Sequence, residues 1–425
     1  MGFFLGVSFL VIIYTVVAAL MAEVNALAIL PANALLALTF VKYLKDCQCN
    51  KKARTICVIL LMVDLVLIIY NSVNRNLPFT NVDWANFDYF AKSALNNSNN
   101  LFEIFGNAID LFTAVVALLY RMFGENVTIV YFYILPLSFV SAHYLYKTIR
   151  LISGDQNKSV WFSMISLIMP VNFIFALSVL REIPIQCVSI ASLYYFLSYT
   201  FKKEKHGLVL AFVLAASAAL MHSGMVAILV VYAYVLLQKK FLKNVKIIRV
   251  STIVFAVILA IVISLPMFAP LLTRFSGDGG ANGVVSAVST QNKYLLDANT
   301  SYISEAPSDF GGLITSLPYR MMMFVVAPLP WQIINGGTLV AFLADAIFRY
   351  YIVYRVIKIA FNLRHYSMED REIVETMLMA VILFDLIFCF GTTNYGQAMR
   401  HRTKMLPFEL CLLSVPVKDK ECLNG

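Results

Sequence analysis

The stretch TICVILLMVDLVLIIYNS, residues 55–72, decides the fold class of this chain. Its single charged residue is Asp64, and its length approaches the roughly 20 apolar residues that cross the hydrocarbon layer of a bilayer. The loop before it, KDCQCNKKAR at residues 45–54, is rich in Lys and Arg. Basic loops stay on the cytosolic side of a membrane, so we expect this span to begin inside and end outside.

Similar apolar runs recur along the whole chain. Of its 425 residues, 60% are hydrophobic and 13% are charged, whereas a soluble domain carries roughly 25% charged residues. We therefore expect an all-α, polytopic transmembrane protein of about twelve spans, with both termini inside. The expected spans lie near residues 2–21, 24–44, 55–72, 126–147, 159–180, 183–201, 207–222, 224–238, 247–270, 336–358, 373–391 and 405–417.

The chain reads as a single integral membrane domain, 1–425, with a first outer loop at 73–123. Within that loop, residues 101–123 are apolar enough to span but carry several charges. If they crossed the membrane, the Lys- and Arg-containing loops at 147–158 and 202–205 would lie outside. An interfacial or re-entrant helix at 101–123 restores the charge rule, and we favour it.

A second large outer loop is expected at 272–335, where Gly, Ser, Asn and Asp are frequent. Its apolar run 321–331 is too short to cross a bilayer. We expect a short re-entrant or interfacial element there.

The net charge of +9 does not indicate a nucleic-acid partner, because the basic residues cluster in short loops between apolar runs. The seven cysteines are scattered, and Cys47 and Cys49 fit solvated loop thiols better than a zinc site. No metal site and no cofactor are expected.

One segment departs from the charge rule. NYGQAMRHRTK, residues 394–404, is external by count yet carries Arg400, His401, Arg402 and Lys404. An anionic ligand on the outer side would explain this, since guanidinium groups match phosphate oxygens bidentately. The alternative is a miscounted span, which would make the segment an ordinary cytosolic loop. Further possible members of an external anion site are Arg274 and Arg320.

The first outer loop supplies carboxylates. Asp83 and Asp88 lie among the aromatic residues Trp84, Phe87 and Tyr89. A carboxylate there is a candidate general base for a sugar hydroxyl, provided that it comes within hydrogen-bond reach. Any interfacial loop also contains such residues, so the motif alone does not assign this role.

Three further polar residues fall at outer span ends: Arg181, Glu182 and His222. For the first two, the alternatives are a snorkelling Arg and a Glu at the positive end of a helix dipole. His222 also fits a turn residue.

Some charges fall within spans, where they usually face a partner or a cavity. Asp345 and Arg349 are four residues apart and are expected to neutralise each other on one helix face. Asp385 is expected to hold Arg400 or Arg402, and Asp64 has no evident partner.

Four places carry a family resemblance. They are Asn74-Arg75 followed by VDWANF at 82–87, SVLRE at 178–182, PLPW at 328–331, and Arg400-His401-Arg402 followed by Pro407. They resemble the oligosaccharide repeat-unit polymerases of bacterial surface polysaccharide synthesis, the Wzy and EpsG-like group, and more broadly the GT-C glycosyltransferases. No Gly precedes Asp83, and Phe87 stands where the family often has Tyr. This leaves open which of Asp83 and Asp88 holds the acidic position.

The resemblance implies an enzyme of the bacterial inner membrane, with a GT-C-like fold and an active site facing the periplasm. It would polymerise undecaprenyl-pyrophosphate-linked O-antigen or capsule units, beside other polysaccharide-assembly proteins and lipid. Catalytic roles would fall to Asp83, Asp88, Arg400 and Arg402. Substrate-binding roles would fall to Arg75, Arg181, Glu182, His222, Arg274, Arg320, Trp331, His401 and Lys404.

Three alternatives stay open. One is a GT-C transferase with a polyprenyl-monophosphate sugar donor. Another is a flippase or transporter for lipid-linked oligosaccharides, although no internal repeat of the kind found in many transporters is visible. The third is a membrane scaffold without catalysis.

Overall fold

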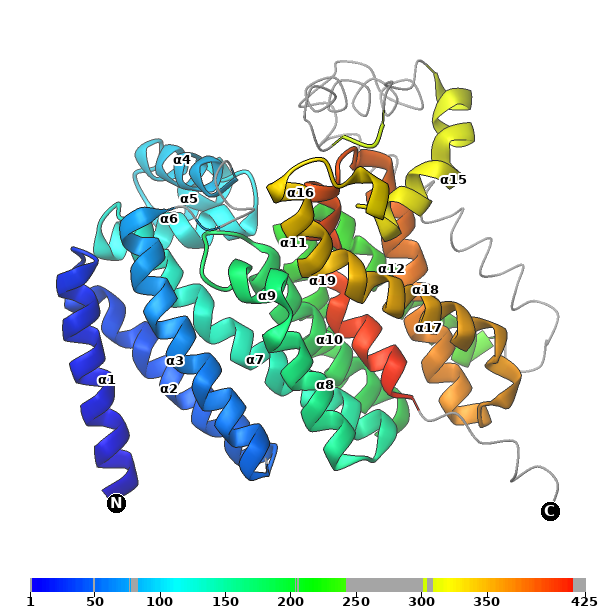
Figure 1. The fold of residues 1–425 in the computed structure, drawn as a ribbon, viewed down its shortest axis with the longest axis horizontal. Helices are drawn as coiled ribbons and strands as arrows, with labels where there is room; N and C mark the ends of the chain where they lie inside the picture. The colour runs from blue at the N-terminus through cyan, green and yellow to red at the C-terminus, as the bar shows by residue number, and fades with distance from the viewer. Residues whose placement is uncertain are drawn as a thin grey trace. The chain divides into compact units, whose positions relative to one another are not determined.

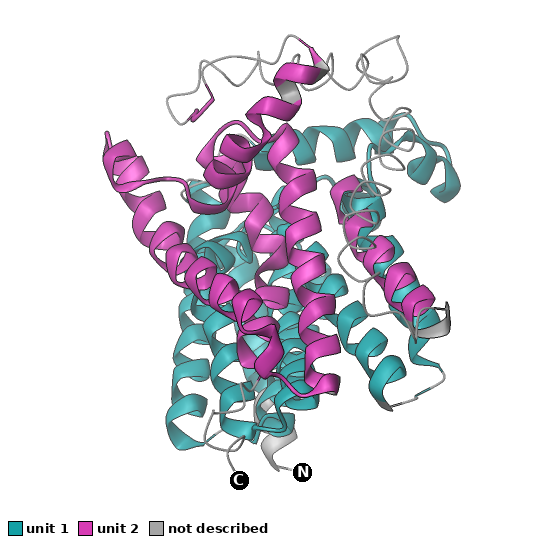
Figure 2. Cartoon of the chain, turned by 90° about the vertical axis from the view of Figure 1, so that its right-hand side faces the viewer, with its two compact units in different colours: residues 1–222 teal, residues 223–425 magenta. Residues whose placement is uncertain are grey.

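The computed structural model describes residues 2–48, 50–75, 77, 83–202, 204, 206–241, 301–303 and 309–415. Over these residues the chain is all-α, and its only strand-like contact is an isolated antiparallel bridge between Ser301 and Asn394 (Figure 1). The contacts divide the chain into two compact units, residues 1–222 and 223–425, coloured separately in Figure 2.

The first unit contains eleven helices in its described part. They are α1 (Gly2–Met21), α2 (Ala26–Asp46), α3 (Lys51–Asn74), α4 (Asp83–Asn96), α5 (Leu101–Asn107), α6 (Leu111–Phe123), α7 (Val127–Ser153), α8 (Gln156–Ile168), α9 (Pro170–Phe175), α10 (Glu182–Lys202) and α11 (Gly207–Met221).

The centre of this unit is α7, which packs against α2, α8 and α10, while α10 also packs against α11 (Figure 1). Buried polar side chains join neighbouring helices. Asn33 Nδ2 donates to Thr15 Oγ1 at 2.9 Å, and the hydroxyls of Tyr43 and Ser163 lie 2.8 Å apart. Lipid tails are as apolar as the side chains, so the hydrophobic effect does not bring helices together within a membrane. Hydrogen bonds between helices then contribute to the stability of the bundle.

Asn and Asp side chains mark many helix starts. Each accepts a hydrogen bond from a backbone N–H of the first turn, which otherwise has no partner within the helix. In the first unit these caps are Asn25, Asn50, Asn100, Asp110, Asn126 and Asp155, and in the second Asp309, Asn335 and Asn394.

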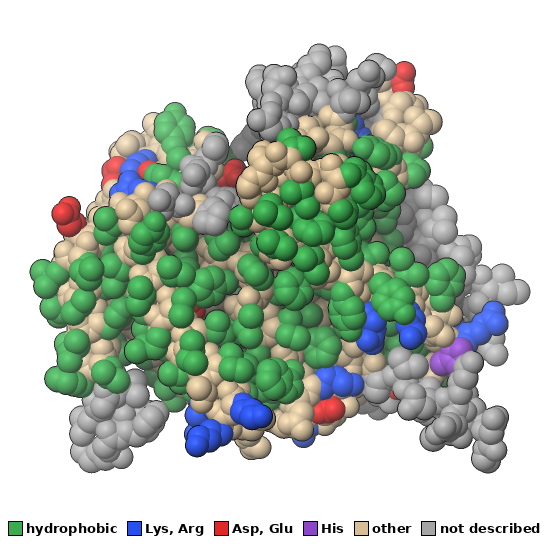
Figure 3. All heavy atoms as spheres, viewed as in Figure 1, with side chains coloured by type: hydrophobic (Ala, Val, Ile, Leu, Met, Phe, Trp, Pro, Cys, Tyr) green, Lys and Arg blue, Asp and Glu red, His purple; other side chains and the backbone are tan. Residues whose placement is uncertain are grey.

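Within the described residues, four helices are long and apolar enough to cross a membrane. They lie at Ala26–Asp46, Lys51–Asn74, Val127–Ser153 and Asp370–Gly391. Large hydrophobic side chains on α1–α3 are strongly exposed, for example Leu10 at 66%, Leu27 at 73% and Val66 at 67%. Figure 3 shows hydrophobic side chains covering this face. An all-α membrane protein explains that exposure, because lipid would cover these side chains. The total of about twelve spans stays a prediction, and the span expected at 247–270 lies outside the described residues.

Residues 83–123, within the segment expected to be the first outer loop, form α4, α5 and α6. At 13 residues, α6 is too short to cross a bilayer, as the interfacial interpretation of residues 101–123 requires. It packs against α4, α5, α7 and α11. Asp110 and Thr113 form a reciprocal capping box that fixes its start.

The two ends of the first unit differ in charge. The basic loop between α2 and α3 contacts the start of α8, because Gln156 Nε2 donates to the carbonyl of Cys47. These Lys- and Arg-rich ends lie at the bottom of the unit in Figure 1, whereas α4–α6 lie at its top. The positive-inside rule predicts that the Lys- and Arg-rich end lies in the cytosol.

The span expected at 159–180 is interrupted. The helix ends at Ile168, turns at Met169 and resumes at Pro170 as α9. Proline has no N–H to donate to the carbonyl four residues earlier, that of Ser166. Asn172 Nδ2 replaces the missing donor at 2.8 Å from that oxygen.

The second unit contains, in its described part, η1 (Ser223–Met225), α12 (Val226–Phe241), α15 (Phe310–Val326), η2 (Pro330–Gln332), α16 (Gly336–Ala341), the π-turn η3 (Phe342–Ala346), α17 (Ile347–Phe361), η4 (Leu363–His365), α18 (Met368–Gly391) and α19 (Tyr395–Ser414). Here α18 packs against α12, α15 and α19, and α17 packs against α15 and α19. The expected short element at 321–331 is the end of α15 together with the turn that follows it.

Candidate functional site

The basic segment 394–404 forms the first half of α19. Asn394 caps this helix through a 2.9 Å bond from the Gln397 amide to its Oδ1. Because α19 packs against α15, α17 and α18, its basic side chains face three other helices. The segment is therefore a packed part of the fold.

Arg402 is almost completely buried, at 1% exposure. Its Nη1 donates to the carbonyls of Phe324 and Val325, both at 3.1 Å, and its Nη2 donates to the carbonyl of Ala327 at 2.8 Å. These carbonyls end α15, where helical acceptors have no donor within the helix. Nη2 also forms an ion pair with the buried Asp345. The Arg402 guanidinium thus connects α19 to the end of α15 and to the π-turn η3.

A second buried ion pair joins Arg349 of α17 to Glu409 of α19. Asp345 and Arg349 do not form the direct ion pair expected within the helix, although their charges still interact; each has its ion pair with α19 instead. The π-turn at Phe342–Ala346 explains the difference. Such a turn widens the helix by a residue, so Asp345 and Arg349 no longer stack as in a regular α-helix.

His401 and Lys404 form a third contact in the same half of α19. Lys404 Nζ lies 2.8 Å from His401 Nδ1, and it also lies 5.3 Å from the centre of the Phe388 ring. The His401 ring packs on Phe388 with centroids 4.4 Å apart. Lys404 is fully buried, whereas Arg400 and His401 are half-buried. These last two are the more accessible cationic or titratable members of the segment.

Arg320 of α15 is also buried, at 1% exposure. Its Nε donates to Ser316 Oγ at 3.0 Å, and its Nη1 donates to the carbonyl of Phe390 at 3.2 Å. Nearby, Tyr302 donates its hydroxyl to the carbonyl of Thr392 at 3.2 Å. Burial raises the pKa of Tyr302, while the charges of Arg402 and Arg320 oppose the rise. The phenol therefore keeps its proton beside two guanidinium groups.

Two further residues, Trp331 and Arg274, were expected to bind substrate. Trp331 is 76% exposed in η2. Arg274 lies outside the described residues.

Among the described residues of the second unit, buried charges do not balance. The buried cations are Arg320, Arg349, Arg402 and Lys404, and the buried acids are Asp345, Asp385 and Glu409. The excess of one positive charge becomes larger when the half-buried Arg400 is included. Guanidinium and ammonium groups gathered in this way match the oxygens of a phosphate, so the group is a candidate anion site. We call Arg320, Arg400, His401, Arg402 and Lys404 the cationic cluster.

The first unit holds the acidic candidates. Asp88 accepts hydrogen bonds from Tyr120 at 2.6 Å and from Lys92 at 2.8 Å. Burial raises the pKa of Tyr120, and the hydrogen bond to Asp88 raises it further. Tyr120 thus remains a donor, and this contact anchors α4 on α6.

Asp83 occupies the first turn of α4 and is half-buried. Arg75, which ends α3 in a left-handed conformation, places its guanidinium 5.6 Å from the centre of the Trp84 ring. The Arg and the Asp-Trp pair of the sequence motif therefore come together at the start of α4.

Arg181 is committed to structural contacts. Its Nη1 lies 2.5 Å from Asp110 Oδ2 and 2.9 Å from the carbonyl of Met221, and its guanidinium lies 5.2 Å from the centre of the Phe87 ring. It ties α4, α6 and the end of α11 to the start of α10. Glu182 is completely buried at that start, and half-buried His222 ends α11.

No group of three or more His, Cys, Asp or Glu residues in the described part of the chain is placed to hold a metal ion. The chain matches no protein-family model, no curated protein and no solved structure. The function must therefore be inferred from the chemistry of the cationic cluster and of the acidic residues of the first unit.

Two residues that contact or neighbour the buried charges of the second unit, Glu409 and Tyr302, were not identified from the sequence. Glu409 lies within the last apolar run, where an ionisable residue signals a partner or a cavity. Tyr302 carries no comparable signal, because its position next to the cluster depends on a bridge to Thr393 that is distant in sequence.

Proposed function

We propose that this protein is a membrane glycosyltransferase that polymerises polyprenyl-diphosphate-linked oligosaccharide units on the outer face of a bacterial inner membrane. The observation that carries the proposal is the gathering of guanidinium, ammonium and imidazole groups on α15 and α19. A diphosphate carried on a lipid is an anion that a membrane-embedded protein meets from within the bilayer. The motif resemblance described above favours the same class of substrate.

In the proposed reaction, a sugar hydroxyl of one lipid-linked unit attacks the anomeric carbon of the growing chain. The bond from that carbon to the diphosphate oxygen breaks, and the lipid diphosphate leaves with the bonding electrons. The cationic cluster would stabilise the charge that develops on the leaving group, an electrostatic contribution that is often the largest in catalysis. The hydroxyl proton passes to a carboxylate acting as general base.

The contacts within each unit refine the roles. Arg402 already donates to three carbonyls and to Asp345, so we assign it a positioning role. Arg400 and His401 then become the groups that would meet the diphosphate. We assign the general-base role to Asp83, because it precedes Trp84, over whose ring the Arg75 guanidinium of the motif lies. Asp88 anchors α4 through its bonds from Tyr120 and Lys92.

The decisive experiment is genetic. Variants would be expressed in a strain that lacks the native copy, and the surface polysaccharide would be separated on a gel. Arg400→Ala and Asp83→Asn should each collapse the ladder to single repeat units. Arg355→Ala is the matched control, since this guanidinium lies over Tyr351 on α17 and takes no part in the cluster; it should leave the ladder intact.

The pattern of products separates the alternatives. A strain without a polymerase still displays single repeat units, whereas a strain without a flippase displays none. An unchanged ladder in both Arg400→Ala and Asp83→Asn, with the variants present in the membrane, would rule out the proposed site.

Anion binding can be measured separately from turnover. Geranylgeranyl diphosphate is a suitable probe, because it has the diphosphate and a short polyprenyl chain. Loss of one charged hydrogen bond of about 1.5–3 kcal/mol corresponds to roughly 10- to 150-fold weaker binding. We expect a change of that size for Arg400→Ala and none for Arg355→Ala.

A further inference from the structure

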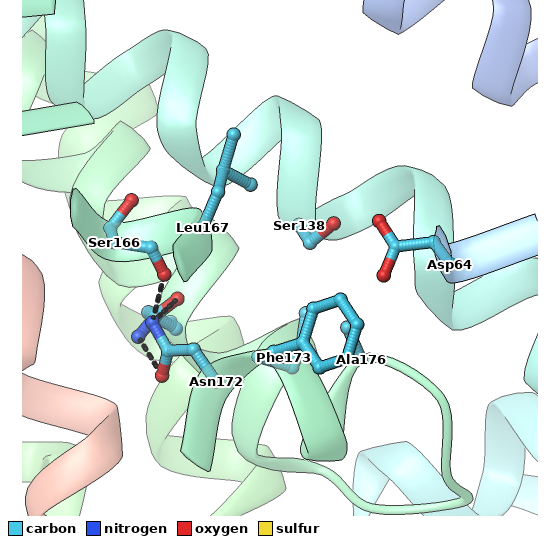
Figure 4. Close-up of a pocket in the computed structure, with 9 residues that line it drawn as sticks. Asp64, Ser138, Ser166, Leu167, Asn172, Phe173 and Ala176 are labelled. Carbon is cyan, nitrogen blue, oxygen red and sulfur yellow. Dashed lines mark hydrogen bonds between the residues drawn. The ribbon is translucent and has the colours of Figure 1, made fainter. Parts of the chain in front are cut away.

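A polar pocket lies inside the first unit, and none of its lining residues takes part in the proposed reaction. It is lined by Asp64 of α3, Ser138 of α7, Ser166 and Leu167 of α8, Asn172, Phe173 and Ala176 at α9, and Ile183 and Gln186 of α10. Its empty space is about 290 Å³ including the open mouth, and the enclosed part holds about one water-sized occupant. Figure 4 shows the Asp64 carboxylate directed toward Ser138 across this space.

Asp64 lies deep in a helix that is long enough to cross a membrane. It is 13 residues from Lys51 and 10 from Asn74, which corresponds to about 20 Å and 15 Å along the helix axis. The residue is only 5% exposed, and its Oδ1 is buried without a hydrogen-bond partner among the described residues. A carboxylate in such a place is costly unless something compensates its charge.

The pocket offers acceptors rather than donors. The hydroxyl of Ser138 donates to the carbonyl of Leu135 at 2.7 Å, and that of Ser166 donates to the carbonyl of Ser163 at 2.7 Å. Each hydroxyl proton is therefore used within its own helix, which leaves oxygen lone pairs as the free groups.

The side-chain amide groups of the pocket also donate hydrogen bonds to neighbouring protein oxygens. Gln186 Nε2 donates to Asn172 Oδ1 at 3.2 Å, and Asn172 Nδ2 donates to the carbonyl of Ser166 at 2.8 Å. No Lys, Arg or His lines the pocket. An occupant must therefore bring positive charge or donors of its own.

The break between α8 and α9 forms one wall of this pocket. Interrupted helices within membranes are tolerated where the irregular backbone lines a cavity. Such breaks commonly hold ions, because they bring polar groups to the middle of the bilayer. Here the break at Met169-Pro170 places Ser166 and Asn172 in the pocket with Asp64.

We propose that this pocket is a binding site for one monovalent metal cation, Na⁺ in particular, with the Asp64 carboxylate and the Ser138 hydroxyl oxygen as its central ligands. One carboxylate balances one positive charge. Ca²⁺ sites draw on several carboxylates and carbonyl groups, and a single carboxylate in a pocket of this size suits a small monovalent ion. The site is independent of the proposed glycosyl transfer, since none of its residues belongs to that reaction.

The proposal is tested on the full-length protein in nanodiscs by equilibrium binding of ²²Na⁺, with choline chloride holding the ionic strength constant. The wild-type protein should bind about one Na⁺ per chain. Asp64→Asn keeps the shape but removes the charge, and it should weaken binding at least 10-fold; Ser138→Ala should weaken it several-fold. Ser192→Ala is the matched control, because its buried hydroxyl donates to the carbonyl of Ala211 outside the pocket.

Thermal unfolding supplies a second measurement. A ligand that binds only the folded state stabilises it, so raising NaCl from 1 to 100 mM should raise the wild-type Tm by about 2–4 °C. The Tm of Asp64→Asn should not change with NaCl. Absence of Na⁺ binding by the wild-type protein would overturn the proposal, whatever the variants do. Equal Na⁺ binding by Asp64→Asn would overturn it too, as would a Tm that responds to pH through Asp64 but not to Na⁺, because a proton would then be the occupant.

Discussion

Removing the Arg402 guanidinium should destabilise the second unit strongly. In Arg402→Met, Asp345 keeps its charge at 3% exposure but loses its ion-pair partner, and the carbonyls of Phe324, Val325 and Ala327 lose a donor. Breaking a buried pair from one side costs about 3–5 kcal/mol, because an uncompensated charge stays behind. The expected loss of unfolding free energy is therefore about 4 kcal/mol.

The double variant separates the ion pair from the carbonyl contacts. Arg402→Met with Asp345→Leu removes both charges, and only the α15 carbonyls remain without their donor, at a cost of about 1–2 kcal/mol. The double variant should thus be more stable than Arg402→Met alone by about 2 kcal/mol.

Unfolding by SDS in mixed micelles, followed by tryptophan fluorescence, measures these differences. Arg355→Met serves as the control for loss of an Arg at a less buried position, and it should change stability by less than about 0.5 kcal/mol. A loss below about 1 kcal/mol for Arg402→Met, or a double variant at least as unstable as that single variant, would contradict the reasoning.

Two further predictions concern the first unit. Tyr120→Phe removes the donor that holds Asp88, so amide hydrogen exchange in α4 should become about 10-fold faster, which corresponds to roughly 1.4 kcal/mol; equal exchange in variant and wild type would exclude an anchoring role. Asn172→Leu leaves the carbonyl of Ser166 without a donor at the Pro170 break. Unfolding in SDS should therefore show a loss of about 1–3 kcal/mol in unfolding free energy. An unchanged unfolding free energy would mean that the amide does not replace the missing proline N–H.

The long apolar runs of the sequence were enough to predict where most helices lie. The run at 55–72 falls within α3, and the expected span at 126–147 overlaps α7 from its first residue, because length and composition alone decide whether a segment suits a bilayer. The charge rule led to the interfacial interpretation of 101–123, which stays a prediction; the structure divides these residues into α5 and the 13-residue α6.

Partner choice within the bundle was less predictable. Spacing suggested that Asp345 pairs with Arg349, but a single π-turn shifted the helix faces and both residues pair with α19. The interruption of 159–180 had a visible signal in Pro170, yet the compensating bond from Asn172 depends on tertiary structure. Sequence spacing identifies residues on one helix, while pairing between helices depends on their packing.

The same limit applies to the candidate site. The sequence pointed to Arg400 and Arg402 alike, and only the structure shows that Arg402 is buried and donates to the Ala327 carbonyl, on which the positioning role proposed for it rests. Likewise, the sequence did not indicate that Asp88 accepts hydrogen bonds from Tyr120 and Lys92.

The central claim is that the cationic cluster faces the outer side of the membrane. Thiol labelling tests it directly, in a parent with Cys49 and Cys422 replaced by Ser, since the other five cysteines are buried. Trp331→Cys places a thiol at a position that is 76% exposed and follows by four residues the Ala327 carbonyl to which Arg402 donates. Phe361→Cys places a thiol at a position that is 85% exposed at the end of α17. A membrane-impermeant maleimide should label position 331 in spheroplasts and position 361 only after permeabilisation. Labelling of position 361 alone in intact spheroplasts would contradict the account.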